Sequence, residues 1–366
     1  MSLPMGRRAV LRGLAPTPPE ALEHHPVLEP QEAPGPASLS PADVIVAVEA
    51  AGVGGVDLLM TSGQYQHVPE PPYTPGMEYA GTVAWRGDAA RGVEGGDAVI
   101  VDGLLTGPRS LGAYRRWGGL ATYAVAPSDA VLPKPAPLSF DEASVLLGAY
   151  ETAYHCLFHR GDVRAGDVVL VHGASGATGL AAVHLAKLAG ATVIATGRSA
   201  DKLAAVREEG ADHVLDTTDL AALRPAVKAL TGGCGVDVVY DPVGGPLSVE
   251  SLRCVAFGAR FLVVGWAATP SVAKGKGGRG AADVNVLPTN LILMKSVDVR
   301  GCPAAISAHR DPRMRADRRD RIMAWAEAGK ITPRVGATFP LASVHDALRA
   351  KWESRAVGSV VVHPRG

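Results

Sequence analysis

The sequence has few cysteines and no excess of either charge. Its 366 residues include four cysteines, and none forms a Cys-x-x-Cys pair. This argues against a disulfide framework and against a cysteine-rich zinc knot. Lys plus Arg and Asp plus Glu number 36 each, so the formal net charge is zero. A neutral chain lacks the basic surface expected of a nucleic-acid-binding or membrane-surface protein.

Long apolar runs are also missing. No run reaches transmembrane length. The first residues also lack the pattern of a leader, in which a charged segment is followed by an apolar one. We therefore expect a soluble, cytoplasmic protein with neither a membrane nor a nucleic acid as partner. Hydrophobic residues make up 47%, an ordinary proportion for a globular protein. The length suggests about two domains.

The first third of the chain is rich in proline and glycine. Its short apolar runs are bounded by turn residues, as at Val44–Val48, Gly81–Ala84 and Ala98–Val101. This pattern predicts a mainly β domain of meander or barrel type.

From Ser139 onward, strand-like and helix-like segments alternate. Ser139 is expected to cap a helix that runs through Leu147, with acids in its first turn. Strands are then expected at Val168–His172, Thr192–Thr196, His213–Leu215, Val236–Tyr240, Arg260–Val264 and Val297–Arg300. Such alternation predicts a doubly wound α/β fold, with a parallel sheet and helices on both faces.

A glycine-rich turn follows the first of these strands, where residues 168–179 read VVLVHGASGATG. One interpretation is a nucleophile elbow carrying Ser175, but that motif needs glycine where this chain has Ala177. The sequence also offers no recognisable histidine and acid that could act as catalytic partners of Ser175. The favoured interpretation is a dinucleotide-binding turn over Ser175, Gly176, Ala177, Thr178 and Gly179. There, Gly176 would allow close approach of a pyrophosphate at the helix N-terminus, and Gly179 would allow the helix to pack on the strand.

The end of the next strand indicates which dinucleotide binds. NAD-binding folds place an acid there to hold the ribose hydroxyls. This chain instead has Gly197, Arg198 and Ser199, with Lys202 next. A guanidinium is well matched to a 2′-phosphate, so the sequence favours NADPH as the cofactor.

Two further segments stand out by composition. For the arginine-rich stretch His309–Arg321, a solvated helix face is favoured over an anion site. Residues 271–282 contain many glycines and lysines, which predicts a mobile loop near the cofactor.

Family membership can be narrowed by position and motif. Short-chain reductases place the glycine turn near the chain start and use a Tyr-x-x-x-Lys pair, which none of the eight tyrosines here forms. The chain instead resembles the medium-chain dehydrogenase/reductase superfamily, and within it the zinc-free quinone oxidoreductases of the zeta-crystallin type. The matching stretches are VEAAGVGGVDLLMTSGQY (48–65), YTPGMEYAG (73–81), GGLATYAVAP (118–127), ETAYHCL (151–157), 169–196, GADHVLD (210–216), VDVVYDPVGG (236–245) and NLILMKSVDVRG (290–301).

The resemblance implies a GroES-like, β-rich catalytic domain built from both chain ends, with a Rossmann domain inserted. We expect the catalytic domain at 1–138 and 305–366 and the NADP-binding domain at 139–304, with the active site in the cleft between them. The resemblance also implies a homodimer formed by pairing the Rossmann sheets edge to edge.

The resemblance further implies that no metal takes part. Zinc-dependent relatives carry a cysteine where this chain has Val53-Gly54, and a histidine where it has Met77 of Gly76-Met77-Glu78. Glu78 alone cannot hold zinc, which needs several thiolate, imidazole or carboxylate ligands.

Without a Lewis acid, the expected reaction is hydride transfer to an already polarised acceptor, either a quinone or a C=C bond conjugated to a carbonyl. By resemblance, Tyr65 lines the active site and can donate to the carbonyl of the small-molecule substrate, and Thr152 lies near the nicotinamide. Packing and surface roles for these two residues stay open. Asp241, Val243, Gly244, Gly265 and Trp266 match loops beneath the nicotinamide and ribose.

Three features depart from the family pattern. Gly54 replaces the usual asparagine and is expected to leave open space. Glu151 is uncommon beside Thr152 and is expected to be exposed. The insertion over Thr106–Arg116 is expected to shape the mouth of the cleft.

Two alternatives remain. An enoyl-thioester reductase would want a basic cleft mouth, for which Arg109, Arg115 and Arg116 are candidates. A non-catalytic NADPH-binding protein would show no turnover.

Overall fold

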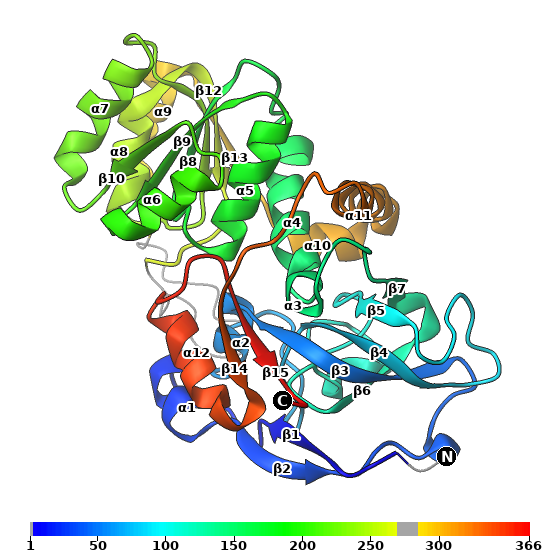
Figure 1. Ribbon diagram of the computed structural model, residues 1–366. Coiled ribbons are helices and arrows are strands. Elements are labelled where there is room, and N and C mark those ends of the chain that lie inside the picture. The colour runs from blue at the N-terminus through cyan, green and yellow to red at the C-terminus, as the bar shows by residue number, and fades with distance from the viewer. Residues whose placement is uncertain (1–2, 269–284) are drawn as a thin grey trace. The chain divides into compact units, whose positions relative to one another are not determined.

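The computed structural model describes residues 3–268 and 285–366, which form two compact units (Figure 1). Unit 1 contains residues 3–148 and 323–366, and unit 2 contains the described residues between 149 and 322. The chain passes from one unit to the other within helix α4 (Leu146–Tyr154) and returns within α11 (Pro312–Glu327). The structure thus divides the chain after residues 148 and 322, whereas the boundaries predicted from the sequence follow residues 138 and 304. The loop expected at 271–282 lies outside the described residues.

Unit 2 is built on a six-stranded parallel sheet. Its strand order is β10-β9-β8-β11-β12-β13, which is the 3-2-1-4-5-6 order of a doubly wound dinucleotide-binding fold. The strands are β8 (Val168–Val171), β9 (Thr192–Gly197), β10 (His213–Asp216), β11 (Val236–Asp241), β12 (Val255–Val263) and β13 (Asp298–Gly301). The predicted α/β class is therefore confirmed.

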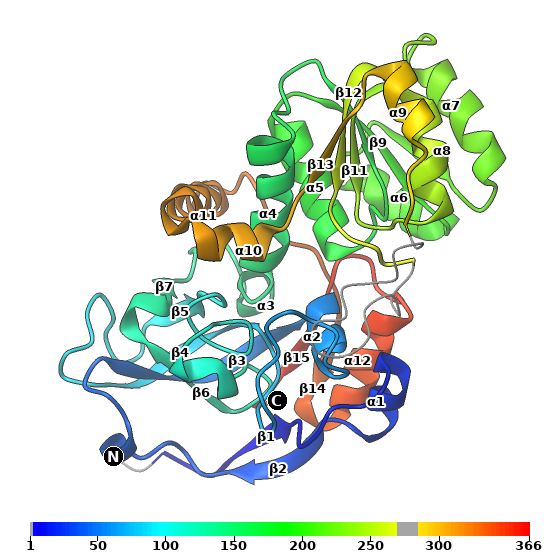
Figure 2. The ribbon, with the colours of Figure 1, turned by 180° about the vertical axis from the view of Figure 1, so that it is seen from behind.

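Helices cover both faces of this sheet. In Figures 1 and 2, α5 and α6 lie on one face, and α7, α8 and α9 lie on the other. These five helices are α5 (Ala177–Leu188), α6 (Ala200–Glu208), α7 (Leu223–Leu230), α8 (Pro246–Cys254) and α9 (Thr289–Lys295), and α10 (Ala304–Arg310) follows β13 in the chain. Helix α5 has apolar residues on nearly all sides because it is mostly buried. A π-helical segment, His155–Arg160, continues α4.

Unit 1 holds a seven-stranded, mostly antiparallel sheet in the order β14-β15-β3-β4-β5-β7, with β6 also paired to β3. Its strands are β3 (Asp43–Val53), β4 (Glu78–Arg86), β5 (Ala98–Val101), β6 (Tyr123–Pro127), β7 (Val131–Pro133), β14 (Val335–Pro340) and β15 (Ser359–His363). A separate ribbon pairs β1 (Gly6–Val10) with β2 (Val27–Gln31). Strand β15 lies against β3, with Val361 opposite Gly52. Both chain ends therefore contribute to the predicted β-rich domain.

The helices of unit 1 are short: α1 (Pro18–His24), α2 (Gly55–Met60), α3 (Phe140–Ala143) and α12 (Val344–Trp352). None of the helices among the described residues is both long and apolar enough to cross a membrane.

The helix expected from Ser139 through Leu147 is interrupted. Ser139 caps α3 as predicted, since its hydroxyl accepts from Glu142 N at 3.2 Å while the Glu142 carboxylate accepts from Ser139 N at 2.7 Å. Helix α3 nevertheless ends at Ala143, and α4 begins at Leu146. Val145 packs with Ala50 and Val361 on the sheet. The prediction of one helix is wrong because this long-range packing, which local sequence does not encode, takes the place of a helical turn.

Candidate functional site

The glycine-rich turn of unit 2 lies between β8 and α5. Gly176 has extended backbone (φ −81°) and caps α5, and the first helical hydrogen bond runs from Leu180 N to Gly176 O at 2.8 Å. The N–H groups before Leu180 therefore lie at the open end of the helix. A Cβ added at Gly179 would lie 2.4 Å from Gly173 O and 2.7 Å from the Ala174 Cα. Only glycine at 179 lets α5 approach the turn this closely.

The histidine next to this turn does not support its interpretation as a nucleophile elbow. His172 is fully buried, its Nδ1 lies 2.8 Å from Thr196 Oγ1, and its Nε2 lies 2.6 Å from Ser251 Oγ. Burial lowers the pKa of His172, so the ring is neutral. His172 therefore joins β8 to β9 and α8 and does not serve as a base for Ser175.

The end of β9 presents the residues expected beside the adenosine ribose. Gly197 is held by Thr217, whose N donates to Gly197 O at 2.8 Å. Arg198 follows directly and is exposed, while Ser199 and Lys202, at the start of α6, are half-buried. The structure thus brings these four residues to one corner of the parallel sheet, at the carboxyl end of its second strand.

The two remaining loops of unit 2 are joined by Asp241. Its Oδ1 accepts from Val243 N at 2.8 Å and from Gly244 N at 2.9 Å, and the Ser248 hydroxyl donates to its Oδ2. Its backbone oxygen also accepts from Gly265 N at 3.3 Å, so the two predicted loops are neighbours. The Asp241 side chain is 2% exposed; it shapes the turn rather than pointing into solvent.

Trp266, by contrast, is 46% exposed, and its Cα lies 3.3 Å from the position of a Cβ added at Gly244. Gly244 has φ +77°, a conformation that glycine adopts without strain. The loops that the sequence places under the nicotinamide are therefore together, with an exposed aromatic ring beside them.

In unit 1, a buried carboxylate connects the two segments that carry metal ligands in zinc-dependent relatives. Asp57 is 2% exposed, and its carboxylate accepts from Gly54 N at 2.9 Å and from Gly76 N at 3.1 Å. Burial raises the pKa of Asp57 to about 6, while these N–H donors and the positive charge of Arg109 act in the opposite direction. Asp57 thus holds the two segments together.

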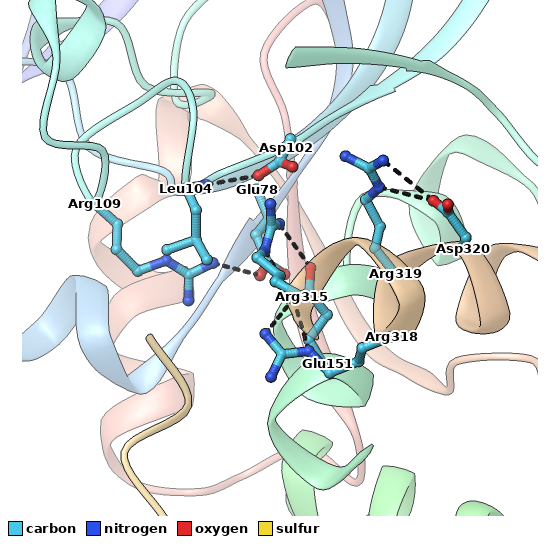
Figure 3. Close-up of polar contacts among 9 residues, drawn as sticks. All are labelled: Glu78, Asp102, Leu104, Arg109, Glu151, Arg315, Arg318, Arg319 and Asp320. Carbon is cyan, nitrogen blue, oxygen red and sulfur yellow. Dashed lines mark hydrogen bonds and ion pairs between the residues drawn. The ribbon is translucent and has the colours of Figure 1, made fainter. Parts of the chain in front are cut away.

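Arg109 extends from the loop that follows β5, and Figure 3 shows it directed toward Glu78. Its Nη2 lies 3.7 Å from Glu78 Oε1, and the two side chains are only 13% and 17% exposed. Glu78 also lies against Gly148, where an added Cβ would be 1.6 Å from Oε1. Glycine at 148 is therefore needed if Glu78 is to keep this position.

Tyr65 is half-buried in the same unit, with its ring centroid 6.0 Å from that of His67 in an edge-on arrangement. Burial raises the pKa of Tyr65, and the charge of Arg109 lowers it. The phenol consequently keeps its proton near neutral pH and can act as a hydrogen-bond donor.

The expectation of open space at Gly54 is wrong. A Cβ added there would meet Asp57 Oδ2 at 3.3 Å and the Met77 Cε at 3.5 Å. The first side-chain atom at position 54 would therefore already touch two neighbours of Gly54, and one of them, Asp57, accepts the Gly54 N–H.

The zinc-binding residues of metal-dependent dehydrogenases are not reproduced. Val53, Gly54 and Met77 offer no zinc ligand. Within the described ranges, no three histidine, cysteine, aspartate or glutamate side chains are grouped so that they could hold a metal ion. The residues present do not fit a catalytic zinc.

Helix α4 carries two residues singled out by the sequence. Thr152 is half-buried. Glu151 is buried, and Figure 3 shows it between Arg315 and Arg318 of α11. Its Oε1 accepts from Arg315 Nη2 at 2.8 Å, and its Oε2 accepts from Arg315 Nε at 3.0 Å and from Arg318 Nε and Nη2 at 3.1 and 2.7 Å.

Two expectations are therefore wrong. Glu151 is not exposed, and the arginine-rich stretch is not a wholly solvated helix face, since the side chains of Arg315 and Arg318 are 8% and 1% exposed. A buried carboxylate requires charged partners, and two arginines three residues apart on one helix supply them.

The insertion over Thr106–Arg116 divides into a buried and an exposed part. Thr106 and Ser110 are buried, and Arg115 donates from Nη2 to Val68 O at 2.7 Å. Arg116 is exposed and lies over the Trp117 ring at 5.7 Å. Of the three arginines considered for a thioester arm, Arg116 is exposed, Arg115 is half-buried, and the side chain of Arg109 is 13% exposed.

Sequence reasoning missed Asp57 and the placement of Arg109. Asp57 lies in a matched stretch, but its role depends on Gly76, which is 19 residues away. A charged residue in an apolar helix of six residues, GVDLLM, is the local signal that could have indicated it.

Comparisons with known proteins agree with the fold of the two units. Residues 40–136 match the family model described as alcohol dehydrogenase GroES-like domain, and residues 177–308 match the model described as zinc-binding dehydrogenase. The quinone oxidoreductase-like protein 2 homolog of Nematostella vectensis is 32% identical over 330 residues, which is 90% of this chain and 83% of that protein. Human quinone oxidoreductase is 29% identical over 304 residues, or 83% of each chain.

A solved mycobacterial structure complexed with NADPH has a TM-score of 0.77 at 27% identity, covering 98% of this chain and 100% of that one.

Proposed function

Because the chain belongs to the medium-chain dehydrogenase/reductase superfamily, in its group of quinone oxidoreductases and quinone oxidoreductase-like proteins, we propose that it is an NADPH-dependent reductase. The proposed acceptor is a quinone or a C=C bond conjugated to a carbonyl, and the reaction proceeds without zinc. The observation that carries the proposal is the unit 1 cluster of Tyr65, Asp57, Glu78 and Arg109, which offers a phenol and fixed charges where a metal site would need ligands.

In unit 2, the residues present fit NADPH. The open N-terminus of α5 and the glycines of its turn suit a pyrophosphate. The exposed Arg198 after β9 suits a 2′-phosphate, and no acid stands between β9 and Ser199. The solved relative with bound NADPH supports this choice. When bound, NADPH supplies the hydride.

The residues of unit 1 suit an acceptor that is polarised before it reacts. Hydride addition to a conjugated carbonyl places negative charge on its oxygen, and a phenol donor such as Tyr65 stabilises that charge. A metal that could polarise the hydroxyl of an alcohol substrate finds no ligand in Val53, Gly54 or Met77. The name of the human relative points to quinones as the acceptor class.

The test is a survey of NADPH oxidation by the purified chain. Quinones, enones and enoyl thioesters are compared at equal concentration, with and without prolonged treatment with a chelator. The proposal expects turnover with quinones or enones that survives chelation, and no stoichiometric zinc in the protein. A preference for enoyl thioesters would favour the thioester reductase, loss of activity on chelation would contradict zinc independence, and NADPH binding without any turnover would favour a non-catalytic protein.

Arg198→Ala is expected to weaken NADPH binding selectively. A charged hydrogen bond contributes about 1.5–3 kcal/mol, which corresponds to about ten- to hundredfold in affinity. NADH lacks the 2′-phosphate, so its affinity should stay nearly constant. Dissociation constants for both cofactors, measured by nicotinamide fluorescence, check this. The exposed Arg207, farther along α6, provides a matched control as Arg207→Ala. Equal losses for NADPH and NADH in the Arg198 variant would rule out the assignment.

We also propose a homodimer formed along β13. Among the described residues this strand pairs only with β12. Val299 on the strand is 41% exposed, and Leu293 and Met294 on α9 are 79% and 74% exposed. An unpaired edge with apolar neighbours favours pairing with a second sheet.

Val299→Lys is expected to convert the dimer to a monomer, because it places a charge on the pairing edge. Light scattering after size-exclusion chromatography should show the mass of one chain instead of two. Leu188→Lys, on α5 and 39% exposed, serves as the control and should leave the mass of a dimer. A wild-type chain that is monomeric at high concentration would refute the proposal.

A further inference from the structure

The unit 1 cluster contains one arginine, Arg109, on a loop that is anchored by several hydrogen bonds. Asp102, which is fully buried, begins this loop, and its Oδ1 accepts from Leu104 N at 3.0 Å (Figure 3). Its backbone oxygen accepts from Leu105 N and Thr106 N at 2.9 and 3.0 Å, and the Thr106 hydroxyl donates to Val125 O at 3.2 Å. The loop is therefore anchored to the sheet before it reaches Arg109.

Glycines allow the loop to press against the segment that precedes Glu78. A Cβ added at Gly103 would lie 2.3 Å from Met77 O and 3.5 Å from Arg109 Nη2. Gly107 has φ +75°, and a Cβ there would lie 3.9 Å from both Gly76 O and Met77 O. The loop thus places the guanidinium beside the segment where zinc-dependent relatives carry a ligand.

Arg109 is the cation that acts on all three functional groups of the cluster. It forms the ion pair with Glu78, and its charge lowers the pKa of both Asp57 and Tyr65 against the opposing effect of burial. Its Nε is buried and has no hydrogen-bond partner among the described residues. A buried guanidinium that is not fully hydrogen-bonded is costly, which argues for a role beyond structural support.

We infer that Arg109, which is held beside Glu78 and the Met77 segment, takes over the electrostatic task of a metal ion and favours acceptors whose oxygen becomes anionic. This inference rests on the proposed function, since it identifies the residue that makes an oxyanion tolerable beside two acids. Without Arg109, Asp57 and Glu78 would repel negative charge on the acceptor. With it, the charge of Glu78 is offset by the ion pair at 3.7 Å, so a negative oxygen on the acceptor is repelled less.

The experiment compares Arg109→Met, which keeps the side-chain length but removes the charge, with Arg109→Lys, which keeps the charge. Arg116→Met is the matched control because Arg116 belongs to the same insertion and is exposed. For a charged interaction of this kind we expect Arg109→Met to lower kcat about ten- to hundredfold on quinone and enone alike. KM and the NADPH dissociation constant should change much less. Arg109→Lys should recover part of kcat, and Arg116→Met should match the wild type.

A second readout does not depend on turnover. Binding of 4-nitrophenolate, an anion that resembles the charged acceptor oxygen, is compared with binding of neutral 4-nitroanisole, with and without NADP⁺. Arg109→Met should weaken phenolate binding about tenfold or more and leave anisole binding nearly unchanged. Equal weakening of both compounds, no phenolate preference in the wild type, or an unchanged kcat would overturn the inference.

The two proposals can fail separately. A wild-type chain without NADPH oxidation, but with phenolate binding that depends on Arg109, would refute the proposed function and leave the anion preference standing. A wild-type chain that reduces quinones while Arg109→Met behaves like wild type in both readouts would refute the inference alone.

Discussion

Glu151→Ala is expected to destabilise the protein by about 3–5 kcal/mol, the usual loss when one partner of a buried ion pair is removed. Glu151 accepts four hydrogen bonds from Arg315 and Arg318, and the side chain of Arg318 is only 1% exposed. Truncation leaves these guanidinium groups without their shared carboxylate in a buried place. Chemical denaturation monitored by circular dichroism gives the change in unfolding free energy.

Asp320→Ala is the control for this measurement. Asp320 lies on α11, as Arg315 and Arg318 do, and pairs with Arg319. Its side chain is 68% exposed, so we expect a loss of at most about 1 kcal/mol in unfolding free energy. The combined replacement of Glu151 by leucine and of both arginines by methionine should restore much of the stability, because an apolar cluster avoids the desolvation of charge. A loss below about 1 kcal/mol for Glu151→Ala itself would show that the arginines find other partners.

Tyr65→Phe is expected to lower kcat about a hundredfold, the typical cost of removing one oxyanion donor. The phenol keeps its proton because burial raises its pKa, so it can donate to the oxygen that becomes negative during hydride transfer. The loss should appear in kcat more than in KM, because the hydrogen bond is strongest in the transition state. Steady-state kinetics with one quinone and one enone measure both constants.

Tyr123→Phe is the matched control. The Tyr123 hydroxyl donates to Pro4 O at 3.1 Å, and the Tyr123 side chain packs within a buried hydrophobic cluster. It should leave kcat within about twofold of the wild-type value, as expected for a group that makes no transition-state contact. If Tyr65→Phe retained full turnover on both acceptors, Tyr65 would be a packing residue, and the acceptor oxygen would be met by water or backbone.

The parts of the molecule that the sequence predicts well are those determined by short-range pattern. The turn between β8 and α5 follows from a strand, three glycines and an apolar helix within 21 residues (168–188), and the capping of α3 by Ser139 follows from the glutamate three positions later. Local backbone chemistry is sufficient for such features.

Other features depend on partners far away in the chain. Glu151 meets Arg315 across 164 residues, and no local property of either residue distinguishes this buried pair from an exposed one. Asp57 depends on Gly76, and the break between α3 and α4 accompanies the packing of Val145 against Val361 of the last strand. Tertiary contacts override local propensity at these positions, which is why the expected exposure of Glu151 and the uninterrupted helix were wrong.

The pairing of β15 with β3 has a consequence for biosynthesis. All residues of unit 2 are translated before β14 and β15 leave the ribosome, whereas the unit 1 sheet has to wait for them. Until Ser359–His363 arrives, one edge of β3 along Ala51–Val53 has no partner. Unpaired strand edges invite wrong association during folding. Ser359–His363 therefore close the open edge of a strand that was made more than 300 residues earlier.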